Sequence, residues 1–290
     1  MEDHPMESPS VRKTPDTAPG GLLESLLEAH FADQALELPL LPTYATQVVA
    51  LCSDPDSDAR SLAQLLQRDP ALAAHVLSVA NSAAMGSREQ IVSLQQAIAR
   101  MGVRSLANVA LSVAVRTKIF RAGRHLERVQ QLWKHSAHSA AWAREIARSR
   151  RHNVESAFLC GLLHEVGAPV VLGVIDEIQR KTALEFPLEE IEAALERLHC
   201  DVGARLVRAW SLPEWTSAAA RYHHAPQDAQ ECADEVYTTH LADRLTRHAR
   251  GEDQLGELDP ILSALGMYQE DLDALLEQST TIQALAEVLS

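Results

Sequence analysis

Aromatic side chains are scarce in this sequence, and so are runs of residues that favour β-structure. Phe, Trp and Tyr together make up 4% of the 290 residues, whereas apolar residues as a whole make up 46%. Runs in which Val, Ile, Thr and Tyr alternate with polar residues are nearly absent. A chain of this length can bury a large core. Since that core has to come from the aliphatic faces of helices, the composition predicts an all-α fold.

Cysteine is also sparse, and its four residues form no Cys-x-x-Cys pair. Their wide separation argues against a disulfide framework and against a structural zinc ribbon. No apolar stretch approaches the ~20 residues that cross a membrane, and the N-terminus lacks the basic-then-apolar order of a signal peptide. We therefore expect a cytoplasmic protein with reduced thiols and no membrane contact. The cysteines are Cys52, Cys160, Cys200 and Cys232.

Positive charge is in deficit overall but is unevenly distributed. The net charge of -14 at pH 7 argues against a surface that binds nucleic acid as a whole. Residues 100–151 nevertheless contain twelve Lys and Arg against two acids, whereas residues 251–290 contain nine acids and no Lys or Arg. Solvated helix faces are the simpler explanation. A basic docking surface for a nucleotide, a nucleic acid or an acidic partner is the alternative.

The organisation of the chain follows from its prolines and helix lengths. Residues 1–20 contain four prolines and few apolar residues, which predicts a disordered leader. Residues 21–122 read as a lobe of short helices, and residues 123–250 as a lobe of longer ones. Residues 251–290 read as acidic C-terminal helices.

Capping residues predict several helix boundaries in the first lobe. Asp69 followed by Pro70 is a typical helix start, and the helix is expected to extend to about Ala83. Ser93 is expected to cap a short helix that ends at Gly102.

In the second lobe, the predicted helix starts lie at Asn, Pro and Asp residues. Asn153 is expected to cap a helix that runs to near Gly167, and Pro169 to open the next. A separate helix is predicted over 201–210, and a pair of C-terminal helices after 259–260.

The histidines and carboxylates in the second half of the sequence are the residues that could bind a metal or take part in a reaction. Each lies on a predicted helix or at a helix end, so several helices of a bundle could bring them to one site for one or two metal ions. Two ions could clamp a phosphate and activate a water. The alternative is a buried hydrogen-bonded network that fixes helix packing. No Gly-rich phosphate loop, Ser-His-Asp order or catalytic Cys signature is visible. The candidates are His135, His164, Glu165, His199, His223, His224 and Asp243.

A polar pair, Asn81-Ser82, and the four tryptophans are each predicted to have a structural role. Asn81-Ser82 is interpreted as a polar helix-end cap that packs one lobe against the other, in preference to a ligand contact. The four tryptophans are interpreted as core or inter-lobe anchors in preference to stacking platforms. They are Trp133, Trp142, Trp210 and Trp215.

Ordered motifs over residues 36–250 resemble the HD superfamily and, within it, the HDOD domain. The HDOD-like segments are LPLLP at 38–42, RDPALAAHVLSVANSAAMG at 68–86 and IVSLQQAIARMGVRSL at 91–106. The HD-like segments are LWKHS at 132–136, GLLHEVG at 161–167, HCDVGA at 199–204, WSLP at 210–213, YHH at 222–224 and HLAD at 240–243. The resemblance implies an HD-like helical bundle with an N-terminal lobe of short helices.

The resemblance also implies roles for the candidate residues. His135 would be the first metal-ligand histidine, His164-Glu165 the pair that names the superfamily, and Asp243 the last carboxylate ligand. His199, His223 and His224 match further histidines of two-metal relatives, whose ions would be Fe, Mn, Zn or Ni. The departure is Glu165, where the pattern has Asp. The extra methylene displaces the carboxylate by ~1.5 Å, and ~1 Å at a reacting centre can cost about 10²-fold in rate. Glu165 is expected to ligate poorly or to turn toward solvent.

HDOD relatives are regulatory modules that occur beside sensor kinases, receivers and cyclic-dinucleotide domains. The resemblance therefore implies bacterial signal transduction, in which this chain binds signalling proteins in trans or a small ligand such as a nucleotide, without efficient catalysis. The alternative is a metal-dependent phosphohydrolase or phosphodiesterase that acts on a nucleotide. The absence of a GYP tripeptide gives no support to cyclic-di-GMP hydrolysis. A third hypothesis is a nucleic-acid-associated regulator that uses residues 100–151, against which the net charge argues.

Overall fold

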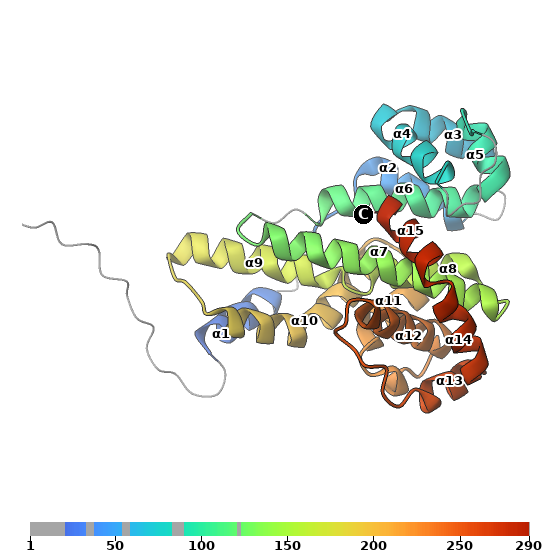
Figure 1. Cartoon of the computed structure of the whole chain (residues 1–290). Helices are drawn as coiled ribbons and strands as arrows, with labels where there is room; N and C mark the ends of the chain where they lie inside the picture. Colours follow the sequence, from blue (N-terminus) through green and yellow to red (C-terminus); the bar gives the residue numbers. More distant parts are fainter. Residues whose placement is uncertain (1–20, 33–37, 54–58, 83–89, 121–122, 290) are drawn as a thin grey trace, which may run out of the picture.

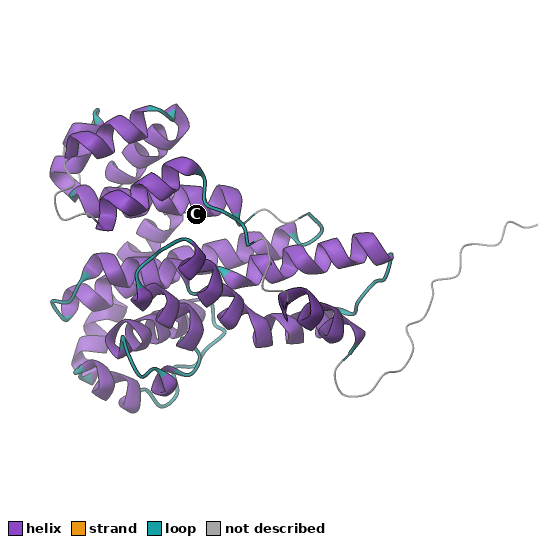
Figure 2. Ribbon diagram, turned by 180° about the vertical axis from the view of Figure 1, so that it is seen from behind, coloured by secondary structure: helices purple, strands orange, loops and turns teal. Residues whose placement is uncertain are grey.

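The computed structural model of the chain describes residues 21–32, 38–53, 59–82, 90–120 and 123–289. Over these ranges every regular element is a helix and no strand is present (Figure 2). The all-α prediction is therefore confirmed. The predicted disordered leader, residues 1–20, lies outside the described residues.

The short helices gather into one group at one side of the molecule (Figure 1). We call this group, α2–α6, the N-terminal lobe. Helix α1, although it comes first in the chain, packs instead against α9 and α10 of the second group. The bounds are α1 Leu22–Ala32, α2 Thr43–Ser53, α3 Ala59–Gln67, α4 Pro70–Ala80, α5 Leu94–Met101 and α6 Val103–Lys118.

The second group, which we call the histidine lobe, is built around α7. This long helix is buried along one side and packs against α8, α12 and α15. The lobe comprises α7 Leu126–Ser149, α8 Val154–Leu163, α9 Gly167–Thr182, α10 Leu188–Ala209, α11 Glu214–Tyr222, the 3₁₀ turn η2 Pro226–Asp228 and α12 Ala233–Ala249.

The acidic C-terminal segment forms three helices. They are α13 Asp259–Leu265, α14 Gln269–Glu277 and α15 Ser279–Leu289. The sequence predicts only a pair, and the additional break lies at Gly266. That residue ends α13 with φ +63, and a capping box between Tyr268 and Asp271 starts α14. Helix α15 then lies across α7 and reaches α4 of the N-terminal lobe (Figure 1).

The predicted caps of the N-terminal lobe are confirmed. The Asp69 carboxylate accepts hydrogen bonds from the amides of Ala71 and Leu72, and Ser93 forms a capping box with Gln96. Helix α4 ends at Ala80, three residues before the predicted end. Thus local capping chemistry places the starts of helices better than their ends.

Three predictions in the histidine lobe are wrong in their boundaries. The helix capped by Asn153 ends at Leu163, and α9 begins at Gly167 and not at Pro169. Residues 201–210 do not form a separate helix, because α10 continues from Leu188 to Ala209. Asp201, the first residue of the predicted helix, lies inside α10 and pairs with Arg221 at 2.9 Å.

The turn between α8 and α9 is held by a close approach of backbones. An added Cβ at Gly167 would overlap the His199 carbonyl oxygen and lie 2.5 Å from the Gly203 nitrogen. Only a residue without a side chain lets α9 start against α10 at this distance. The crossing brings the His164–Glu165 turn beside the His199 segment.

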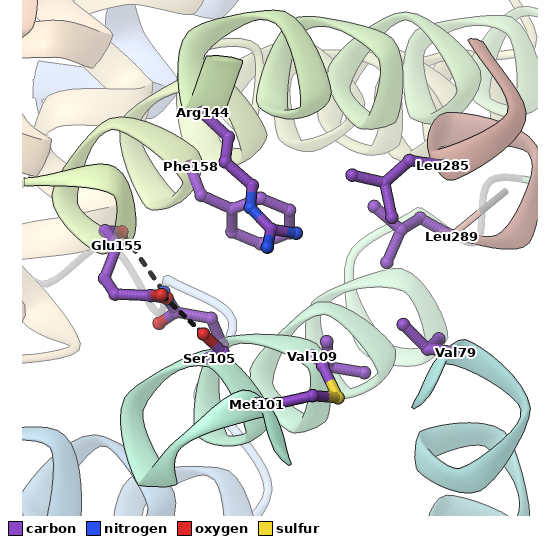
Figure 3. A pocket seen from close by; sticks show the side chains of 10 residues that line it. Val79, Met101, Ser105, Val109, Arg144, Glu155, Phe158, Leu285 and Leu289 are labelled. Atoms are coloured by element: carbon purple, nitrogen blue, oxygen red, sulfur yellow. Dashed lines mark hydrogen bonds between the residues drawn. The ribbon is translucent and has the colours of Figure 1, made fainter. Parts of the chain in front are cut away.

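Polar and apolar contacts join the two lobes. Glu155, in the first turn of α8, accepts hydrogen bonds from Ser105 Oγ at 2.5 Å and from Asn108 Nδ2 at 3.0 Å. Around this pair, Phe158 and Arg144 of the histidine lobe face Val109 across the seam, with Leu285 and Leu289 of α15 beside them (Figure 3). The C-terminal helix therefore contributes apolar side chains to the seam.

Asn81 caps the end of α4, as predicted, but it does not bridge the lobes. Its Nδ2 donates to the carbonyls of Leu77 at 2.9 Å and Ile91 at 2.8 Å, and its Oδ1 accepts from the Ile91 amide at 2.7 Å. The side chain thus ties α4 to the segment before α5 inside one lobe.

Three tryptophans are buried, as the core interpretation predicts. Trp133 Nε1 donates to the Leu289 carbonyl at 3.2 Å, and Trp210 Nε1 donates to the Pro39 carbonyl at 2.8 Å. These bonds tie segments near the two ends of the described chain to the histidine lobe. Trp142 is enclosed, whereas Trp215 is half-buried.

The expectation that no apolar stretch approaches the length of a membrane span is wrong. The helical stretch Val154–Thr182 is long and apolar enough, but 89% of its apolar window is buried inside the fold. Such burial is what a core helix of a globular fold shows. A second stretch, Leu94–Met101 with Val103–Lys118, qualifies only if its two helices are joined, and they bend by 116°.

The backbone crossing at Gly167 generates a stability prediction. Gly167→Ala is expected to lower the free energy of unfolding by about 1–3 kcal/mol, because the new methyl group overlaps α10. Gly173→Ala on the same helix is the matched control, since nothing lies within 4 Å of its added Cβ. There the free energy of unfolding should stay unchanged or rise by up to ~1 kcal/mol. Urea unfolding of both variants measures the difference. Equal free energies of unfolding for the two variants would contradict the close approach of α9 and α10 at Gly167.

Candidate metal centre

The fold brings all seven predicted site residues to one place in the histidine lobe. One lies on α7, two follow α8, one lies on α10, two follow α11 and one lies on α12. Their ligand atoms form overlapping groups inside the bundle. In that order along the chain they are His135, His164, Glu165, His199, His223, His224 and Asp243.

The orientation of three histidine rings is fixed by backbone carbonyls. The Nδ1 atoms of His164, His199 and His223 donate to carbonyls three or four residues earlier, at 2.8, 2.7 and 3.1 Å. A carbonyl can only accept, so each neutral ring carries its proton on Nδ1. The Nε2 lone pair is then directed into the cluster. This is the arrangement that orients histidines as metal ligands.

The first group of ligand atoms belongs to His135, His164 and Asp243, all three of which are buried. His135 Nε2 lies 2.8 Å from Asp243 Oδ1 and 3.3 Å from His164 Nε2. The Asp243 oxygen lies 3.9 Å from His164 Nε2. Two imidazoles and a carboxylate therefore face a common point.

The second group centres on His199. Its Nε2 lies 3.4 Å from His223 Nε2 and 3.1 Å from His224 Nε2. A thiol that received no role from the sequence joins them, since Cys200 Sγ lies 3.3 Å from the same His199 nitrogen. The signal available in the sequence was its position directly after a predicted ligand histidine.

Glu165 lies between the two groups. Its carboxylate oxygens are 3.8 Å from His223 Nε2 and 4.0 Å from His199 Nε2, and they also group with His164. The side chain is 14% exposed. The alternative that the longer Glu turns toward solvent is therefore wrong. The tight turn between α8 and α9 holds the residue with its carboxylate toward the histidines.

The separations between histidine nitrogens fit a shared ion. In their neutral forms His199 and His223 both carry their proton on Nδ1, so their two Nε2 lone pairs face each other without a hydrogen bond. Ligand nitrogens about 2.0–2.1 Å from one ion lie about 2.8–3.4 Å apart. The observed 3.1, 3.3 and 3.4 Å fall in this range. The side chains present could hold one or two divalent ions.

Burial keeps two of the rings neutral, which is the form that binds metals. It lowers the pKa of His164 to about 4, and neighbouring His135 acts in the same direction. Burial also holds the pKa of His223 well below its usual value. These imidazoles therefore present lone pairs at neutral pH.

The carboxylates stay ionised despite their burial. Burial raises the pKa of Asp243, but the hydrogen bond from His135 and the nearby histidines outweigh it and lower that pKa. Burial likewise raises the pKa of Glu165, and His199 with its neighbours brings it below the usual value. Burial lowers the pKa of His199, yet its thiol and carboxylate neighbours raise it to about 9. The carboxylates therefore favour a cation in this cluster, which is a proton on His199 when no metal ion is bound.

The site opens through polar cavities. One cavity of about 320 Å³ is lined by Glu165, His199 and His224, and another of about 320 Å³ by His135 and Asp243. Both are also lined by Arg128 and Arg247. Arg247 received no functional role from the sequence, whereas Arg128 belongs to the basic segment 100–151. The position of Arg128 at the cavity wall agrees, for this one residue, with the alternative that residues 100–151 form a basic docking surface.

The family model of the HDOD domain matches residues 38–226, which is more than half of the chain. The chain belongs to the HDOD family. The match includes both lobes and the histidines up to His224, and it ends before α12, which supplies Asp243.

Solved structures of similar fold include an HDOD domain protein from Geobacter sulfurreducens. It shares 24% identity with this HDOD chain at a TM-score of 0.71, with 92% of this chain and 97% of that one covered. A candidate metal-dependent phosphohydrolase from Shewanella amazonensis SB2B shares 23% identity at a TM-score of 0.69, with 91% and 98% covered. At these identities the shared property is the fold.

An uncharacterized protein of Treponema pallidum (strain Nichols) is 27% identical over an alignment of 241 residues, which covers 78% of this HDOD chain. The chain spans 45% of the length of that protein. It likewise spans 65% of a candidate signal transduction protein from Marinobacter aquaeolei VT8, with 22% identity and a TM-score of 0.71. Both relatives are longer than the part that matches.

The ring geometry generates a prediction about metal content. His164→Ala is expected to weaken metal binding at least ~10-fold, because it removes a buried, oriented ligand. His248→Ala is the control, since this exposed histidine on α12 bonds only to the Asp253 carbonyl among the contacts described. Elemental mass analysis of protein purified without chelator or affinity nickel measures the difference. Metal that is absent from the wild type as well, with both proteins folded, would favour the structural network.

Proposed function

We propose that this chain is a metal-binding module of bacterial signal transduction that works in the cytoplasm on signalling proteins in trans. Its cavity would bind a phosphorylated small ligand such as a nucleotide. The observation that carries the proposal is the convergence of seven ligand side chains on one centre that opens into cavities flanked by Arg128 and Arg247.

The candidate ligands would form two metal sites. His135, His164 and Asp243 would hold one ion and His199, His223 and His224 a second, with Glu165 between them. Bound ions would supply Lewis-acid charge for phosphate oxygens.

The arginines suit a phosphate at the cavity wall. Arg128 pairs with Glu192 at 2.8 Å and is 43% exposed, and Arg247 lies 3.7 Å from Asp243 and is 44% exposed. Guanidinium groups recognise phosphate oxygens with charge-assisted, often bidentate hydrogen bonds. The two guanidinium groups thus lie beside the candidate metal centre. Metal ions bound there would attract the same anionic phosphate.

Binding without efficient turnover is favoured by the ligand set. Glu165 stands where the HD pattern has Asp, and its longer side chain alters the position of the carboxylate between the two groups. The second group already places three imidazoles and a thiol around one point. Catalytic metal sites keep a coordination position open, whereas sites filled by side chains are structural.

A metal-dependent phosphohydrolase that acts on a nucleotide is the second candidate. It is favoured by the fact that the cavities reach both ligand groups. Binding experiments that also follow the fate of the ligand separate the two functions.

The test combines calorimetry with product analysis on the metal-loaded protein. A panel of nucleoside mono-, di- and triphosphates is titrated, and each mixture is then analysed for released phosphate. Binding of an intact nucleotide supports the signalling module, and metal-dependent release of phosphate supports the hydrolase. A protein that retains metal yet neither binds nor hydrolyses any member of the panel would contradict both forms.

The cavity wall generates a prediction on affinity. Arg128→Gln is expected to weaken binding of the panel nucleotide by about 10- to 100-fold, the equivalent of one charged hydrogen bond. Lys181→Gln is the control, because this exposed lysine on α9 pairs only with Glu177 among the contacts described. Isothermal titration calorimetry measures both variants, and metal content should be unchanged in each. Equal losses in the two variants would point to a general charge effect.

A further inference from the structure

We propose that Cys200 is a metal ligand of the second group and makes it a zinc site of three imidazoles and one thiolate. The inference rests on the proposed metal centre and names the chemistry of one of its halves. The ligand atoms of His199, Cys200, His223 and His224 all lie within 4.8 Å of one another.

The distance between Cys200 and its neighbour fits a shared ion. Zinc lies about 2.0–2.1 Å from imidazole nitrogen and about 2.3 Å from thiolate sulfur, so adjacent ligands of these kinds are about 3.0–3.6 Å apart. Cys200 Sγ lies 3.3 Å from His199 Nε2. The two histidines that follow α11 complete the set from the opposite side, with His224 Nε2 3.1 Å from the same nitrogen.

Cys200 differs from the other cysteines whose side chains the structure describes. Cys160 is buried in the core, where its thiol contacts the Trp215 carbonyl at 3.5 Å. Cys232 precedes α12 in the left-handed region, with φ 57, and groups with no histidine in the described part of the chain. Cys200 alone among these three belongs to a group of ligand atoms.

The donor set decides which ion fits. Thiolate is a soft ligand, and sites of nitrogen and sulfur with four side chains are typical of zinc rather than of magnesium or manganese. When the ion binds, the S–H bond of Cys200 breaks and its proton goes to solvent. The first group, with two imidazoles and the Asp243 carboxylate, is harder and leaves room for a ligand. The second ion would then hold α10 and the end of α11 together, and the first would face the cavity.

Cobalt spectroscopy tests this assignment directly. The full chain is stripped of metal and reloaded with Co²⁺ alone, and the near-ultraviolet thiolate-to-Co²⁺ charge-transfer band is recorded together with the stoichiometry of bound Co²⁺. The wild type is expected to show the band, Cys200→Ser to lose it, and Cys232→Ser to retain it. Circular dichroism checks that each variant is folded.

A second measurement uses the wild type and does not depend on the folding of a variant. Alkylation of Cys200 by iodoacetamide, located by peptide mass analysis, should be at least ~10-fold slower with Zn²⁺ bound than in the stripped protein, because a coordinated thiolate is a poor nucleophile. Cys232 in the same sample serves as the internal control, and its rate should not change.

The outcomes separate this inference from the proposed function. If Co²⁺ binds without the band, or the band survives in Cys200→Ser, the metal centre stands and Cys200 is a thiol hydrogen-bonded to His199. If the wild type binds no Co²⁺ at all, the inference and the metal centre both fail. Equal alkylation rates with and without Zn²⁺, in protein shown to hold the ion, also overturn the role of Cys200.

Discussion

The close crossing of α9 and α10 at Gly167 and Gly203 determines where the other helices can place their ligands. It holds the turn with His164 and Glu165 against the segment that carries His199. A second close contact lies at the other end of the same motif, where an added Cβ on Gly161 would come within 2.6 Å of the Ser139 carbonyl oxygen on α7. Because both ends of the segment are fixed by backbone packing, its imidazole and carboxylate cannot move apart to relieve their crowding.

That crowding of buried polar groups has a physical cost. Buried imidazoles with facing lone pairs and buried carboxylates are each unfavourable unless a proton or a cation lies between them. The Asp243 carboxylate is compensated by His135 at 2.8 Å, and the Nε2 atom of His199 faces those of His223 and His224 at 3.4 and 3.1 Å. A divalent ion at each group would supply this positive charge, and metal binding would then stabilise the histidine lobe.

The seam between the lobes and the histidine centre lie at opposite ends of α8. The first turn of α8 contains Glu155, which accepts hydrogen bonds from α6 of the N-terminal lobe, and His164 and Glu165 follow the C-terminal end of the helix. One rigid helix therefore spans from the seam to the centre. The helix is apolar and largely buried, so close packing fixes its position between the two.

The sequence by itself determined the helical class, the caps at Asp69, Ser93 and Asn153 and the identity of seven ligand candidates, since these depend on composition, local hydrogen bonding and ordered motifs. It did not determine that α10 is continuous through Asp201, that Glu165 faces the histidines, or that Cys200 and Arg247 join the site. Each of these depends on contacts between residues far apart in the chain. Only the tertiary structure decided them, because the packing of α8, α10, α11 and α12 sets which side chains share one point.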